Sequence, residues 1–179
     1  MNMFYLSTRP HECAEWSVNS HCVKMILESA QLLSTAHRVL DGVEYIDDSG
    51  KRKVKRWRLS DWREDKLYSA THVNHPCAIW CRETSSNYRW LHDLLIEYCF
   101  EYTYRYEKTH KLEQSGLLSD LSMLPHNIKR SDRTIPPSAM DPKYIVSEDP
   151  ILNYRNYYKY GKVHLHKWKN RDKPHWLVE

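Results

Sequence analysis

Three side chains that general acid–base chemistry uses recur at helical spacing near the start of the chain. His21, Lys24 and Glu28 are three and four residues apart, so a helix places them within one arc of its surface. The stripe continues with Gln31, Thr35 and Arg38. A solvated helix face is the simplest interpretation. An imidazole, an amine and a carboxylate within two turns also favour a catalytic role for His21, Lys24 and Glu28.

A second group lies in segment 71–76, which reads Thr-His-Val-Asn-His-Pro. The proline predicts a helix start, where free backbone donors attract phosphate, so His72, Asn74 and His75 are candidate nucleic-acid contacts. Capping of the helix by Asn74 or His75 is the structural alternative. His72 and His75 are also potential metal ligands with Cys77 and Cys81, but no CxxC pair is present. We therefore expect no bound metal ion.

Basic and aromatic residues alternate near the C-terminus, as in grooves where cations engage phosphates and rings stack on bases. Residues 154–176 read YRNYYKYGKVHLHKWKNRDKPHW, with a single acid. The candidate nucleic-acid contacts here are Arg155, Lys159, Lys162, Lys167 and Trp168. Further candidates elsewhere in the chain are Arg38, Arg89, Arg105 and Lys108. Anchoring of the tail by its own aromatic rings is the structural alternative.

The layout resembles the pyrimidine-dimer DNA glycosylases of the phage endonuclease V class, and it is also similar to uncharacterised phage proteins. Three stretches carry the resemblance. They are Leu-Glu-Ser-Ala-Gln-Leu-Leu at 27–33, Asn-His-Pro at 74–76 with Asn-Tyr-Arg-Trp at 87–90, and Tyr-Tyr-Lys-Tyr-Gly-Lys at 157–162.

This resemblance implies a helical DNA-repair fold, a flipped nucleotide and an imine mechanism without a cofactor. Its essential carboxylate maps onto Glu28, and its nucleophile is the N-terminal amine. Two positions depart from the family pattern: Leu27 stands where the family has an arginine, and Asn2 is large enough to hinder removal of Met1. The amine would then be that of Met1.

The periodicity predicts a mainly α, compact single-domain fold over residues 1–179, with a small β-hairpin insertion at 43–60. The expected order is a strand at 2–6, a brief helix to about residue 16, a long helix at 17–40, the hairpin, and helices from residue 76 and over 85–111. One more short helix is expected within 112–124, followed by a long loop at 125–149. A helix from Pro150 to Gly161 then leads into the basic aromatic tail at 155–179.

Composition excludes several classes of protein. The four glycines are too far apart for a GxGxxG turn, a Walker A loop or a GxSxG elbow. No apolar run approaches the roughly 18 residues of a membrane span, and the net charge of +4 suggests a polyanionic partner. Five cysteines at irregular spacing are typical of reduced thiols. With no signal peptide visible, we expect a cytoplasmic protein, in the host cytoplasm if viral.

The sequence favours a DNA-acting, cofactor-free N-glycosylase or lyase on damaged or modified pyrimidine bases in double-stranded DNA. An α-amine ordinarily has a pKa of about 7.7–8.0, against about 10.4 for a lysine side chain, so Met1 is a better nucleophile than Lys24. One alternative is a non-catalytic nucleic-acid-binding phage protein. The other is a metal-dependent nucleotide enzyme that uses His72 and His75.

Overall fold

The computed structural model describes residues 1–178 and is 52% helical, which confirms the mainly α fold with a small hairpin. The helices and strands through the middle of the chain are α1 (Pro10–Glu15), α2 (Asn19–Asp41), β1 (Val43–Asp47), β2 (Val54–Arg58), α3 (Arg63–Lys66), α4 (Pro76–Glu83) and α5 (Ser85–Tyr106). The later elements are α6 (Lys111–Gln114), α7 (Leu117–Asp120), η1 (Pro142–Tyr144), α8 (Pro150–Asn156), η2 (Tyr157–Gly161), η3 (Val163–Leu165) and η4 (His175–Leu177).

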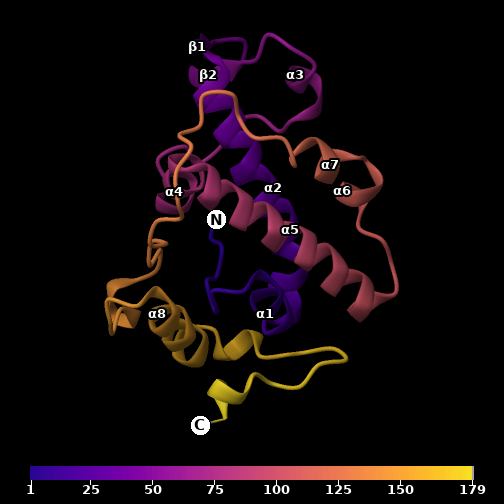
Figure 1. Cartoon of the computed structure of the whole chain (residues 1–179), viewed down its shortest axis with the longest axis vertical. Helices are drawn as coiled ribbons and strands as arrows, with labels where there is room; N and C mark the ends of the chain where they lie inside the picture. The colour runs from indigo at the N-terminus through magenta and orange to yellow at the C-terminus, as the bar shows by residue number, and fades with distance from the viewer. Residues whose placement is uncertain (179) are drawn as a thin grey trace.

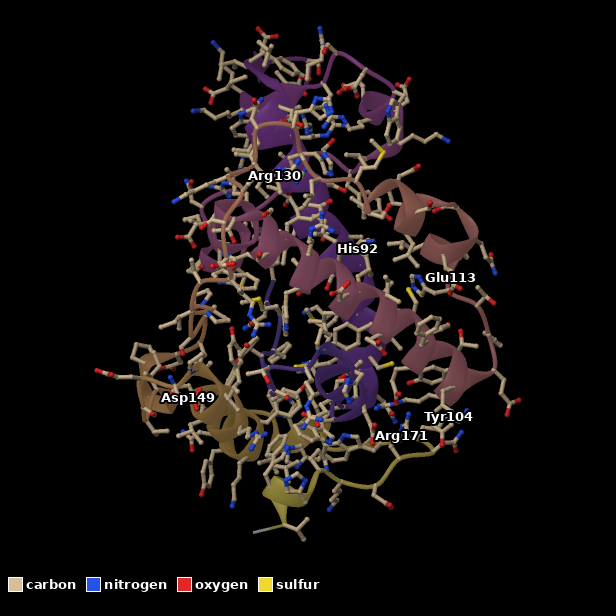
Figure 2. All side chains as sticks on the ribbon, in the orientation of Figure 1. His92, Tyr104, Glu113, Arg130, Asp149 and Arg171 are labelled. Carbon is tan, nitrogen blue, oxygen red and sulfur yellow. The ribbon has the colours of Figure 1, made fainter. Side chains whose placement is uncertain are left out.

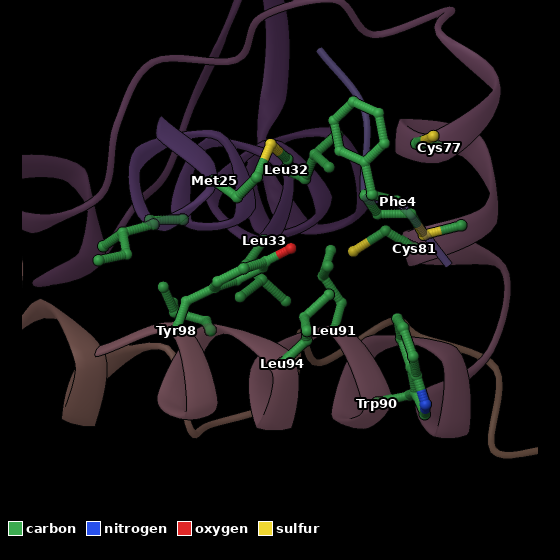
Figure 3. Packing of buried hydrophobic residues seen from close by; sticks show 14 of the residues in the cluster. Phe4, Met25, Leu32, Leu33, Cys77, Cys81, Trp90, Leu91, Leu94 and Tyr98 are labelled. Atoms are coloured by element: carbon green, nitrogen blue, oxygen red, sulfur yellow. The ribbon is translucent and has the colours of Figure 1, made fainter. Parts of the chain in front are cut away.

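The two long helices, α2 and α5, cross in the middle of the molecule and form most of its core (Figure 1). Leu33 of α2 meets Leu91 and Leu94 of α5 between the helices (Figure 3). This packing buries one face of the long helix that was predicted at residues 17–40. Thr84 caps α5 by accepting a hydrogen bond from the Asn87 N–H (3.1 Å), and the helix ends at Tyr106, five residues before the predicted end.

The predicted hairpin is present at one end of α2 (Figure 1). Its strands pair antiparallel, from Val43 opposite Arg58 to Asp47 opposite Val54. Most of its side chains are exposed, so core burial contributes little to its stability. The hairpin is instead held by polar contacts, including one from Arg38 of α2 to the Trp57 carbonyl (3.1 Å).

The N-terminal segment, residues 2–6, is buried but is not a strand, so that prediction is wrong. A strand needs a neighbouring strand for its backbone groups. Here the Asn2 N–H binds the Glu28 carboxylate, and the Met3 N–H binds the Asn2 side chain (2.8 Å). Phe4 has a positive φ of 43°, an uncommon conformation for an aromatic residue, and its ring contacts His21 of α2 and Tyr154 of α8.

The C-terminal third wraps around the helical core. Residues 125–149 are irregular apart from η1, as predicted. Asp149 caps α8 by accepting from the Ile151 N–H (2.8 Å), and the chain continues through the π-helical turn η2 to Gly161. A Cβ at Gly161 would lie 2.5 Å from the Tyr157 ring, so glycine allows this close approach. Within residues 1–178, no helix combines the length and apolar character needed to cross a bilayer.

Candidate active site

Glu28 lies in the middle of α2 with its carboxylate between two amines. Its Oε2 atom accepts a hydrogen bond from the Asn2 N–H (3.0 Å) and lies 3.9 Å from the Met1 amine. Its Oε1 atom pairs with Lys24 Nζ at 2.9 Å. Glu28 is only 8% exposed, whereas the Lys24 side chain is 62% exposed. The solvated-face interpretation is therefore wrong for Glu28, and the carboxylate is held at the boundary between core and solvent.

The amine is held in place by Asn2. The Asn2 side chain is buried, and its Nδ2 donates to the Ala139 carbonyl (2.7 Å). Its Oδ1 accepts from the Tyr154 hydroxyl of α8 (2.8 Å) as well as from the Met3 N–H. The Met1 side chain is 3% exposed although the residue as a whole is half-buried, so the exposed part of Met1 is its main chain. The α-amine thus lies beside Glu28, and the Met1 side chain is buried.

His21 lies on the same face of α2, but its contacts are structural. Its Nδ1 atom is 2.6 Å from the Tyr158 hydroxyl, and its ring stacks on Phe4 with centroids 4.0 Å apart. Burial, helped by the positive charges of Lys162 and Lys24, lowers the pKa of His21 to about 3. It is therefore neutral near pH 7 and does not contact Glu28. A role as the catalytic acid does not fit this geometry, and His21 positions the N-terminal segment instead.

His75 borders the Glu28 centre from α4. Its Nδ1 atom accepts from the Cys77 N–H (3.2 Å), so it caps α4, as the structural alternative predicted. Burial lowers the pKa of His75, with smaller contributions from the positive charges of the N-terminal amine and His72, while the Glu28 carboxylate opposes the change. His75 is thus close enough to the amine and to Glu28 for their charges to act on it. His72 and Asn74 are exposed beside it.

A metal site is not formed by the described residues. Among residues 1–178, no three His, Cys, Asp or Glu side chains come together as potential ligands. Cys77 and Cys81 face the core, where burial raises the pKa of the Cys77 thiol to about 12 and disfavours a thiolate ligand. The metal-dependent alternative with His72 and His75 gains no support from this arrangement.

Two predicted nucleic-acid contacts, Arg38 and Arg105, are unavailable to a ligand. Arg38 is 6% exposed and binds the Glu64 carboxylate at 2.6 Å. Arg105 is fully buried, pairs with Glu101 at 2.6 Å and donates to the Ser17 carbonyl (2.8 Å). Both guanidinium groups join distant segments of the chain. The prediction of phosphate contacts by these two residues does not fit the structure, because their donors are already satisfied.

The tail combines anchors with exposed cations. Trp168 donates from its indole to the Trp16 carbonyl (3.0 Å), and Arg155 donates to the Leu6 carbonyl (3.0 Å) while lying over the rings of Trp16 and Trp176. These two residues hold the tail on the core, as the structural alternative proposed. Outside the 71–76 segment, the predicted contacts that remain exposed or half-exposed are Arg89, Lys108, Lys159, Lys162 and Lys167.

The sequence did not identify Asn2, Tyr154 and Tyr158 as parts of the site. Asn2 was considered only as an obstacle to removal of Met1, and the two tyrosines were treated as members of an aromatic tail. Tyr154 is 152 residues from Asn2, and no local spacing relates them. The only sequence feature that could have indicated these contacts was an amide side chain next to the N-terminus.

Comparisons of the chain with protein-family models, curated proteins and solved structures found no match. A carboxylate held against an α-amine can take a proton from the ammonium form, which leaves a neutral nucleophile. It can also stabilise positive charge that develops on a carbon attacked by that amine.

Proposed function

We propose that the protein is a cofactor-free DNA N-glycosylase or lyase that acts on damaged or modified pyrimidine nucleotides through the Met1 α-amine and Glu28. The single observation that carries the proposal is the 3.9 Å approach of this amine to Glu28 Oε2. Exposed cations of the hairpin and tail, among them Lys53 and Lys167, would engage the DNA phosphates.

The reaction begins when the neutral amine forms a bond to C1′ of the deoxyribose. The bond from C1′ to the base breaks, and the base leaves with the electron pair and takes up a proton. The C1′–O4′ bond then breaks, its electrons go to the oxygen, which is protonated, and the amine nitrogen loses its proton to form an imine at C1′. Glu28 would accept the proton of the ammonium group and stabilise the cationic stages. Water hydrolyses the imine or β-elimination breaks the strand.

Lys24 is the second candidate nucleophile because its Nζ lies 2.9 Å from Glu28 Oε1. Its side chain is 62% exposed. An α-amine is ordinarily less basic than a lysine side chain, so more of it is neutral and it is the better nucleophile. The two amines are on opposite oxygens of one carboxylate, so the choice between them is open to direct test.

The test is borohydride trapping on a duplex with one abasic site, followed by mass spectrometry of the covalent adduct. We expect an adduct on the peptide that contains Met1, retained in Lys24→Met and lost in a chain extended by a few residues before Met1. An adduct on Lys24 would overturn the assignment of the nucleophile.

No adduct with any form of the protein would overturn the enzymatic proposal. The non-catalytic nucleic-acid-binding function would then be favoured, because the exposed cations of hairpin and tail do not depend on the Glu28 centre.

A further inference from the structure

A second cavity lies between the hairpin and the 70–74 segment, and it is separate from the Glu28 centre. Its volume is about 650 Å³, within the range of small-molecule sites. The hairpin wall is formed by Lys53, Lys55 and Trp57 with Glu44, and the opposite wall includes Thr71, His72 and Asn74. Trp57 is half-buried, whereas Lys53, His72 and Asn74 are exposed.

The charge of this hairpin cleft is positive. Lys55 is neutralised by Glu44 at 2.9 Å, but Lys53 has no ion-pair partner within residues 1–178. Lys51 and Arg52 precede Lys53 on the same arm and add to the local potential. The Nδ1 atom of His72 is 2.8 Å from the Thr71 hydroxyl, which leaves Nε2 as the ring nitrogen available to a ligand.

Both walls of the hairpin cleft are fixed to α2. Arg38 binds the Trp57 carbonyl on the hairpin side, and Thr35 exchanges hydrogen bonds with the backbone of Thr71 (3.1 and 3.3 Å) on the other. Thr35 is seven residues after Glu28, which is about 10 Å along a helix. Stacked nucleotides rise about 3.4 Å each along one strand, so a DNA strand that runs along α2 would place the cleft about three nucleotides from the Glu28 centre.

Another cavity of similar size does not have this character. It measures about 620 Å³ and is lined by Tyr104 and Arg171 together with Glu15 and Asp172. Arg171 is paired with Glu101 at 2.9 Å and lies 4.1 Å from the Tyr104 ring centroid (Figure 2). The positive charge of Arg171 is neutralised within the protein, and the lysine of this cavity, Lys173, follows Asp172 in the chain.

A third cavity, lined by Tyr102, Lys108 and Lys111, also has cations beside an aromatic ring, but it lies at the C-terminal end of α5. The hairpin cleft has a cation that is unpaired within residues 1–178 beside an aromatic ring, and its walls are hydrogen-bonded to α2, the helix of Glu28.

We propose that the hairpin cleft holds one nucleotide of the bound DNA, about three positions from the processed nucleotide, with its base against Trp57 and its phosphate on Lys53 and His72. This inference rests on the proposed function for the identity of the ligand as DNA. Trp57 supplies a stacking surface that every base can use, and Asn74 supplies donors and an acceptor for a base edge. The hairpin would thereby set the position of the duplex relative to Glu28.

The first test compares two exposed lysines of the same arm, one inside the hairpin cleft and one outside it. Binding of Lys53→Ala and Lys51→Ala to a duplex with one abasic site is measured by fluorescence anisotropy over a range of salt. Lys53→Ala should reduce the salt slope by about 0.9, the value for one lost phosphate contact, and Lys51→Ala should change it by less than half as much. Trp57→Leu should weaken binding at least about fivefold with an unchanged slope.

The second test places 5-iodouracil at successive positions of the duplex and maps the photo-crosslinked peptide. We expect a crosslink to the peptide with Trp57 from one position about three nucleotides from the abasic site. Equal slopes for the two lysine variants together with normal binding by Trp57→Leu would overturn the inference. So would a polyglutamate peptide that competes as well as DNA of equal charge, because the cleft would then favour an acidic protein.

These binding measurements are independent of imine trapping. Failure of trapping with a crosslink at Trp57 removes only the enzymatic proposal. If trapping succeeds but neither Lys53→Ala nor Trp57→Leu changes DNA binding, only the proposed role of the hairpin cleft is overturned.

Discussion

The two ends of the polar stripe on α2 have the same helical periodicity but different surroundings. At one end Arg38 directs its guanidinium N–H groups to the Glu64 carboxylate and to backbone carbonyls, including those of Tyr68 and Leu67. Ten residues towards the N-terminal end, Glu28 is bound by the Asn2 N–H and by Lys24, whose side chain is largely exposed. The Arg38 end is closed by the protein itself, and the Glu28 end has partners that face solvent.

Helical spacing therefore predicts which residues share a face of the helix, but not whether other segments of the protein cover that face. A guanidinium that binds fixed carbonyls holds two segments together and has no donor left for a ligand. A buried carboxylate beside an exposed amine is held in place yet can exchange a proton. The first arrangement belongs to the stability of the fold, and the second belongs to the proposed chemistry.

The largest effect on stability is expected at the closed end. Arg38→Met should lower the free energy of unfolding by about 3 kcal/mol, because it removes the ion pair and leaves several buried carbonyls without donors. Urea denaturation measures the change. Arg89→Met, an exposed arginine of α5, is the matched control and should change stability by less than about 0.5 kcal/mol. Equal effects of the two variants would contradict the distinction between the ends.

Two buried histidines, one near each end, should make stability depend on pH. Burial and the charge of Arg63 lower the pKa of His37 to about 4, and the pKa of His21 is lowered to about 3. Both are neutral in the folded and unfolded chains above pH 6.5. As the pH falls towards 4, only the unfolded chain takes up protons at these two sites, so stability is lost. The expected slope approaches about 1.4 kcal/mol per pH unit for each histidine.

Denaturation curves between pH 4 and 7 measure this slope. His21→Gln and His37→Gln should each lower this slope by the contribution of about one proton, which is about 1.4 kcal/mol per pH unit. His11→Gln changes an exposed histidine of α1 and serves as the control. A slope that is unchanged in His21→Gln would show that His21 is not held neutral by the fold.

Local sequence patterns predicted the helices and the hairpin, but not the contacts between distant segments that form the site. The periodicity of residues 17–40, the hairpin pattern at 43–60 and the proline at 76 each act within a short stretch of chain, and the corresponding elements are present. The N-terminal segment was predicted incorrectly because its conformation depends on contacts between Asn2 and residues more than 130 positions away.

The same limit applies to individual charged residues. The basic and aromatic neighbours of Arg105 along the chain predict that it contacts a phosphate. Its burial depends on Ser17 and Glu15, 88 and 90 residues earlier, which the sequence pattern does not relate to it. Glu28 was identified because the helical spacing and the family resemblance both point to it. Its burial against the N-terminal segment became evident only in three dimensions.

In the proposed reaction, Glu28 assists an amine in forming an imine with DNA. Glu28→Gln keeps the shape of the side chain and removes its charge, and Glu97→Gln is a matched control on α5. Because Glu28 is buried and accepts charge-assisted hydrogen bonds, its variant should also lose about 1–2 kcal/mol of stability, so folding is checked by circular dichroism.

The deciding measurement is the single-turnover rate of borohydride-trapped adduct formation on a duplex with one abasic site, at saturating protein. We expect folded Glu28→Gln to bind this DNA but to form the adduct at least about 100-fold more slowly, while Glu97→Gln matches the unmodified protein. A Glu28→Gln rate close to that of the unmodified protein would rule out the role proposed for Glu28.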